Sequence, residues 1–185
     1  MAYNSSIKGF WYKKHLMPGV DKPATLEVIL TDSEGALTIG DAVQWTSGFL
    51  TIAATTESVL GILVGFVTEK GENLFKTNES HGGTISGDDT FTASSTNEST
   101  EKVKGVVIVD PYALFLNTAD STLTSAEVGT YFDTTSGSDQ VTSSGSGTIA
   151  QFQLIELVTV DDEGSADDDC GLFRNSQSQL GWASS

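Results

Sequence analysis

Short apolar stretches separated by turns rich in Ser, Gly and Asp run through most of the sequence. Four stretches combine β-branched and aromatic residues over lengths typical of strands: residues 25–30, 103–109, 113–116 and 149–160. Two further stretches, residues 42–45 and 49–53, flank Thr46-Ser47-Gly48 and predict a hairpin with a glycine-containing loop. The pattern therefore predicts a protein built of strands.

The most apolar run covers residues 59–67 and contains Gly61 and Gly65. That glycine spacing would also suit the face of a close-packed helix. The Val, Ile and Phe content and the turn-rich flanks favour a buried central strand, in which glycine marks a bulge or the approach of another backbone. Residues 120–127 are expected to form one short helical turn.

Composition supports the same fold class. The chain of 185 residues contains 22 Ser, 23 Thr and 19 Gly, whereas residues that favour helices are few. An apolar content of 38% argues against a disordered chain. We predict an all-β protein, an antiparallel β-barrel or β-sandwich with long polar loops and extended N- and C-terminal segments.

Local changes in composition divide the chain into three parts. Residues 1–22 are predicted to form a basic, aromatic N-terminal arm, and residues 23–160 the β domain. Residues 161–185 read as an acidic loop, with six carboxylates in 161–169, followed by a C-terminal tail. Within the β domain, residues 78–100 are polar and predict a long exposed loop that only Ile85 and Phe91 could anchor.

The N-terminal arm is the candidate partner-binding element. Residues 1–20 carry a net charge of +3, whereas the whole chain carries −16, and such asymmetry is typical of a docking segment. The residues predicted to bind a partner are Lys8, Phe10, Trp11, Tyr12, Lys13 and Lys14. In the alternative interpretation, Trp11 and Tyr12 fold back onto the protein's own sheet. Trp45 is expected in the core, beside Val43.

Residues suited to chemistry are sparse, and we predict no enzyme, cofactor or metal site. Neither His15 nor His81 lies in a pattern typical of a catalytic triad. Carboxylates next to Cys170 disfavour its thiolate. The acidic run at 161–169 lacks the alternation of a calcium-binding loop and reads as solvated, although a divalent cation there stays open.

The charge and hydropathy of the chain exclude two classes of partner. A net charge of −16 argues against nucleic-acid binding, which depends on clustered Lys and Arg. No stretch approaches the roughly 20 apolar residues that span a bilayer, and residues 1–10 lack the apolar region of a signal peptide. We therefore expect neither nucleic acid nor membrane as a partner.

Several segments together resemble the capsid decoration, or cement, proteins of tailed bacteriophages. The resemblance is carried by Ile39-Gly40-Asp41-Ala42-Val43, the strand at 59–67, the run Val106–Pro111, and residues 155–162 ahead of Gln179-Leu180-Gly181. It covers about half of the chain, from Ile39 onward. The long segment at 78–100 departs from the compact members of that family.

This resemblance implies a structural protein on the outer surface of the virion head, made in the host cytoplasm. It further implies binding to the major capsid protein, bridging of its subunits, and a homo-oligomer (a trimer) or clustered copies on the capsid. Two alternatives stay open. One is a tail, neck or fibre component of a phage virion, and the other is a β-sandwich module that binds carbohydrate or a receptor, with Trp11, Trp45 and Trp182 stacking on sugar rings.

Overall fold

The computed structural model describes residues 9–30, 36–55, 57–71, 73, 83–85, 90–93, 102–120, 122–135, 141–142, 151–158, 170–176 and 180. Its named strands pair in antiparallel fashion throughout. The predicted all-β class is therefore confirmed. The strands form separate sheets packed together rather than a closed barrel. None of the helices among the described residues has the length and apolarity needed to cross a membrane.

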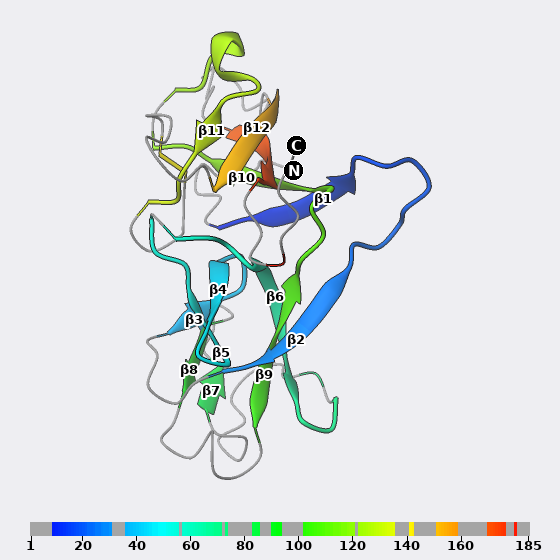
Figure 1. Cartoon of the computed structure of the whole chain (residues 1–185), viewed down its shortest axis with the longest axis vertical. Coiled ribbons are helices and arrows are strands. Elements are labelled where there is room, and N and C mark those ends of the chain that lie inside the picture. The colour runs from blue at the N-terminus through cyan, green and yellow to red at the C-terminus, as the bar shows by residue number, and fades with distance from the viewer. Residues whose placement is uncertain are drawn as a thin grey trace.

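Sheet A occupies one end of the molecule (Figure 1). Its strands, in spatial order, are β1 (Trp11–His15), β10 (Ala113–Thr118), β13 (Cys170–Asn175), β12 (Phe152–Leu157) and β11 (Tyr131–Phe132). The first and the last of the described strands, β1 and β13, thus lie on either side of β10. A single 3-10 turn, η2 (Ser125–Glu127), falls within the stretch expected to form one helical turn.

Sheet B contains the predicted hairpin and the predicted central strand. Its spatial order is β2 (Thr25–Ile29), β9 (Val103–Ile108), β6 (Gly61–Thr68), β4 (Ala42–Thr46) and β5 (Phe49–Ile52). The most apolar run of the sequence therefore becomes the middle strand, as predicted. Gly61 allows β9 to approach, because a Cβ at this position would overlap the carbonyl oxygen of Ile108.

Sheet C corrects one expectation from the sequence. It consists of β3 (Leu37–Thr38), β8 (Thr90–Ala93) and β7 (Gly83–Ile85), so two of its strands come from the segment at 78–100. Phe91 is buried, and its ring lies 5.4 Å from that of Phe66. The long exposed loop predicted at 78–100 therefore contains two strands, and Phe91, one of the two residues expected to anchor it, is buried between sheets C and B.

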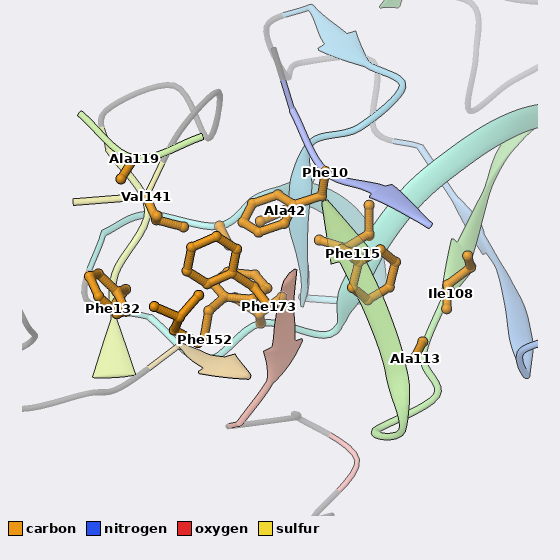
Figure 2. Close-up of a cluster of buried hydrophobic side chains, with 14 of the residues drawn as sticks. Phe10, Ala42, Ile108, Ala113, Phe115, Ala119, Phe132, Val141, Phe152 and Phe173 are labelled. Carbon is orange, nitrogen blue, oxygen red and sulfur yellow. The ribbon is translucent and has the colours of Figure 1, made fainter. Parts of the chain in front are cut away.

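Two large hydrophobic cores and a smaller outer cluster form among the described residues. The lower core lies between sheets B and C, and its larger members are Val28, Leu30, Leu37, Leu50, Leu63, Phe66, Phe91 and Val107. The shared core joins sheet A to sheet B. It contains Ala42, Ile62 and Ile108 from sheet B, the rings of Phe115, Phe132, Phe152 and Phe173 from sheet A, and the ring of Phe10, immediately before β1. Figure 2 shows these five rings converging on one region. The shared core makes sheets A and B one packed body.

A buried amide adds polar contacts to the shared core. Gln151 is fully buried, and its Oε1 accepts hydrogen bonds from the backbone N–H and the hydroxyl of Thr134, at 2.8 and 3.1 Å. Its Nε2 donates to the carbonyl oxygens of Ala54 and Glu57, both at 2.7 Å. This side chain therefore connects the segment that enters β12 to the loop that follows β5.

The three-part division expected from the sequence does not follow the sheets. The boundary at residue 22 would separate β1 from the sheet to which it belongs, and the boundary at residue 161 would separate β13 from its neighbours. Both strands pair with β10, at the registers Trp11↔Leu116 and Phe173↔Phe115. Strands β1 and β13 are thus integral parts of sheet A.

Candidate docking surface

Phe10 was predicted to bind a partner but lies in the core. Its side chain is only 1% exposed, and its ring stacks on Phe152 with 4.3 Å between centroids. It also meets the edge of Phe115 at 6.4 Å. Its backbone N–H donates to the carbonyl of Gly40 at 2.8 Å, which ties it to sheet B. The assignment of Phe10 to partner binding is therefore wrong, because an apolar ring in the shared core is not accessible.

The next residues form an edge strand of sheet A rather than an arm. Tyr12 is half-buried, with its ring 6.3 Å from that of Phe115, so it packs on the protein's own sheet as the alternative interpretation held. Trp11 lies on the opposite face and is 48% exposed. The register shifts between Tyr12 and Lys14, which places Lys13 in a bulge. Lys8 lies outside the described residues.

Lys14 has a partner within the protein. Its Nζ lies 2.7 Å from Oε2 of Glu156 on β12, and both side chains are about half exposed. Of the residues proposed for partner binding, Trp11 and Lys13 keep an exposed position, whereas Lys14 has part of its charge engaged in this ion pair.

The stretch that follows β1 is more exposed than β1 itself. Residues 16–22 are exposed at every position, and they include the apolar side chains of Leu16, Met17 and Val20. The β1–β2 connection, residues 16–24, projects away from the body of the molecule (Figure 1). Tyr112, in the turn between β9 and β10, is also exposed. We call these four apolar residues the loop patch. The loop patch was not predicted from the sequence, because Phe10, Trp11 and Tyr12 just before it are the stronger signal of an interaction site.

Both ends of this loop are attached to one turn, residues 109–112. At the start of the loop, the N–H of Leu16 donates to the carbonyl of Tyr112 at 2.9 Å. At its end, the N–H of Ala24 donates to Oδ2 of Asp110 at 3.1 Å, and the carbonyl of Ala24 accepts from Val109 at 3.0 Å. The loop connects β1 of sheet A to β2 of sheet B, and the turn connects β9 of sheet B to β10 of sheet A. These two connections between the sheets therefore lie next to each other.

His15 and Asp110 form the polar base of the loop. The two side chains are largely buried, with His15 Nε2 3.1 Å from Asp110 Oδ2. An ionised carboxylate only accepts hydrogen bonds, so His15 Nε2–H is the donor to Asp110. His15 Nδ1 lies 3.0 Å from the backbone nitrogen of Met17 and 3.3 Å from its carbonyl oxygen. His15, for which the sequence predicted no role, thus positions the first turn of the loop.

The environment of Asp110 favours its charged form. Burial raises the pKa of this carboxyl, but the hydrogen bonds donated by the N–H groups of Tyr112 and Ala24 and by His15 lower it further than burial raises it. The net result is a pKa below the ordinary value of an aspartate. Asp110 therefore stays ionised at neutral pH and accepts all three hydrogen bonds.

Other residues singled out in the sequence are placed as follows. Trp45, expected in the core, is exposed on the β4–β5 hairpin, because it lies at the end of the strand beyond Val43. Cys170 is buried on sheet A. His81, Trp182 and residues 161–169 lie outside the described residues. Within the part of the chain that the structure describes, no three His, Cys, Asp or Glu side chains are grouped as a metal site would require.

Comparisons with known proteins add no relative. No protein-family model matches the chain, and neither a curated protein nor a solved structure matches it.

Proposed function

We propose that this chain is a structural virion protein that decorates the outside of a tailed-bacteriophage head and bridges subunits of the major capsid protein. The proposal starts from the resemblance of several short segments to capsid decoration proteins. One structural observation supports it: three of the segments that carry the resemblance lie next to one another in one sheet.

That observation concerns the middle of sheet B. The Gly40-Asp41-Ala42-Val43 segment enters β4, the apolar run forms β6, and the Val106–Pro111 run ends β9. These three strands are consecutive neighbours, with Val43 opposite Gly61 and Ile62 opposite Ile108. A common fold requires its motifs to occupy neighbouring places, and these three segments do so.

The surface is suited to the proposed role. A net charge of −16 gives copies on a particle an outer face that repels other particles. The loop patch supplies exposed apolar side chains on the same body. We expect clustered copies or a trimer on the capsid, in contact with the major capsid protein.

The test is binding to heads that lack this protein. Purified chain is mixed with heads and, separately, with tails from the virus that encodes it, and bound protein is measured by co-sedimentation. A reconstruction of decorated heads then locates the added density. Saturable binding to the outer surface of heads is expected. Binding to tails alone would instead support a tail, neck or fibre component.

A carbohydrate-binding module is the second candidate, favoured by one observation. Trp45 is 47% exposed on a hairpin, and an exposed indole is a suitable surface for a sugar ring. A glycan array probed with the purified protein and with Trp45→Ala tests this candidate. Binding of a glycan by the wild-type chain that Trp45→Ala abolishes would favour it over decoration of the head.

A further inference from the structure

We infer that the β1–β2 loop, residues 16–24, is the part of this protein that contacts its partner, and that the partner presents an apolar hollow edged by carboxylates. The inference rests on the proposed function, because it takes the partner to be another protein of the particle. It moves the contact from the predicted residues 8–14 to a loop that begins within the same N-terminal segment, immediately after β1.

Exposed apolar side chains are grouped at this loop. Single exposed apolar residues are common on proteins, whereas a group of them on one projecting feature marks an interaction site. Leu16, Met17 and Val20 are exposed within five positions of one another, and Tyr112 is joined to the start of the loop through the Leu16 hydrogen bond. Burying these side chains against a partner would remove their apolar area from water.

The loop is ordered by contacts within the protein before it binds a partner. Pro18 and Gly19 occupy the central positions of a turn, and Gly19 has a φ of +83°, which suits glycine at the second of these positions. Pro23 restricts the chain near the other end. The two ends are attached to residues 109–112, and His15 and Asp110 form the base. A loop that is already ordered loses little conformational entropy on binding.

The loop and the strand before it carry a net positive charge. Residues 9–24 contain Lys13, Lys14 and Lys22 against Asp21, a net of +2 in a chain whose total is −16. Lys22 is an exposed residue of the loop itself, and Lys13 is exposed on the strand that leads into it. A carboxylate-edged surface would be attracted to this region and repelled by the rest of the chain, which favours docking with the loop first.

The experiment compares three proteins for binding to heads and to tails. The loop variant carries Leu16→Ser, Met17→Ser and Val20→Ser, which alter only exposed side chains. The matched control carries Val128→Ser and Tyr131→Ser, two exposed apolar residues near the β11 edge of sheet A. We expect the loop variant to bind at least tenfold more weakly than wild type, and the control to bind normally, with unchanged melting temperatures.

A charge variant keeps the inference testable if the loop variant does not fold. Lys22→Glu should weaken binding and reduce its dependence on salt, because it removes an attraction that salt screens. Lys70→Glu, which changes an exposed lysine outside the loop, is the control and should bind as wild type does. Equal effects of the two substitutions would overturn the inference.

The outcomes separate this inference from the proposed function. If the loop variant binds heads as tightly as wild type, the inference is wrong and the proposed function stands. If wild type binds only tails and the loop variant loses that binding, the proposed function is wrong and the inference stands. If wild type binds neither particle, both are wrong.

A second copy of this chain also carries many carboxylates and is the other partner to test. Light scattering therefore measures the oligomeric state of the wild type and of the loop variant. Conversion of an oligomer to monomers by the loop variant, with binding unchanged, would make the loop a contact between copies and overturn the inference.

Discussion

Lys14 and Glu156 meet at 2.7 Å although their strands, β1 and β12, are separated in sheet A by β10 and β13. At the usual strand spacing, three such steps amount to roughly 14 Å. Lys14 is opposite Leu114 and Glu156 is opposite Leu172, on the face of sheet A that points away from the shared core. The ion pair therefore crosses a small outer cluster, formed by Leu114, Leu116, Cys170 and Leu172.

The Lys14–Glu156 pair should contribute little to stability by its charge. Both side chains are about half exposed, and exposed pairs contribute about 0–1 kcal/mol. Lys14→Met, which keeps most of the aliphatic stem, should change the free energy of unfolding in urea by less than about 1 kcal/mol. Leu172→Ala should lower it by about 2–5 kcal/mol, because Leu172 is buried. Equal losses for the two variants would contradict this.

The same substitution should destabilise the protein much more at Phe10 than at Trp11. Phe10→Ala removes a ring stacked in the shared core and should lower the free energy of unfolding by about 3–5 kcal/mol. Trp11→Ala alters a half-exposed side chain and should cost about 1 kcal/mol or less. Deletion of residues 1–17 removes β1 and should impair folding. Thermal unfolding followed by circular dichroism measures the stability of all three variants. A deletion variant that melts like wild type would show that residues 1–17 form an arm that folding does not require.

Asp110 should make the stability of the protein depend on pH in the acid range. Its folded-state pKa lies below the ordinary value of 3.8, so its contribution is fully present above that pH. The contribution is lost as the pH falls through the lowered folded value. Asp110→Asn should lower the free energy of unfolding by about 1–3 kcal/mol at pH 7. The difference between variant and wild type should shrink below about pH 3.8, as measured by urea unfolding across pH. A difference independent of pH would contradict this role.

Gly61 and Gly65 offer a matched comparison within one strand. A Cβ on Gly61 would overlap the carbonyl oxygen of Ile108 on β9, whereas a Cβ on Gly65 meets no other atom within 4 Å. Gly61→Ala should therefore force the two backbones apart and cost about 3 kcal/mol or more. Gly65→Ala should change the free energy of unfolding by about 1 kcal/mol or less. Urea denaturation of both variants tests this, and equal losses would show that the close approach at Gly61 is not what requires glycine.

Much of sheet B was predictable because its strands bury long apolar runs. The hairpin at 42–52 and the strands β6 and β9 follow directly from pattern and turn residues. Trp45 was misplaced because alternation alone cannot say where the core ends along a strand. Strand β8 was missed because one residue, Phe91, carries its burial in a segment that is otherwise polar.

Sheet A was harder to predict because two of its strands lack a clear period. In β1 a bulge at Lys13 interrupts the alternation, and the residue that reaches the core, Phe10, precedes the strand. In β13 the apolar residues divide between two faces, with Phe173 in the shared core and Leu172 in the outer cluster. The loop patch could not be predicted from the sequence, because it depends on which side chains are exposed and on a turn near Asp110 that is distant in sequence.

The position of β10 between the first and the last strand has a consequence for synthesis of the chain. During translation β1 leaves the ribosome first, but Phe10 cannot stack until Phe152 has been made, and β10 has only one neighbour until β13 follows. The strands of sheets B and C are complete by residue 108. They are free to assemble early, while sheet A waits for contacts that are distant in sequence and slow to form. A nascent chain arrested before residue 170 would expose the unpaired edges of β10 and β12, and these edges invite aggregation until β13 pairs with both.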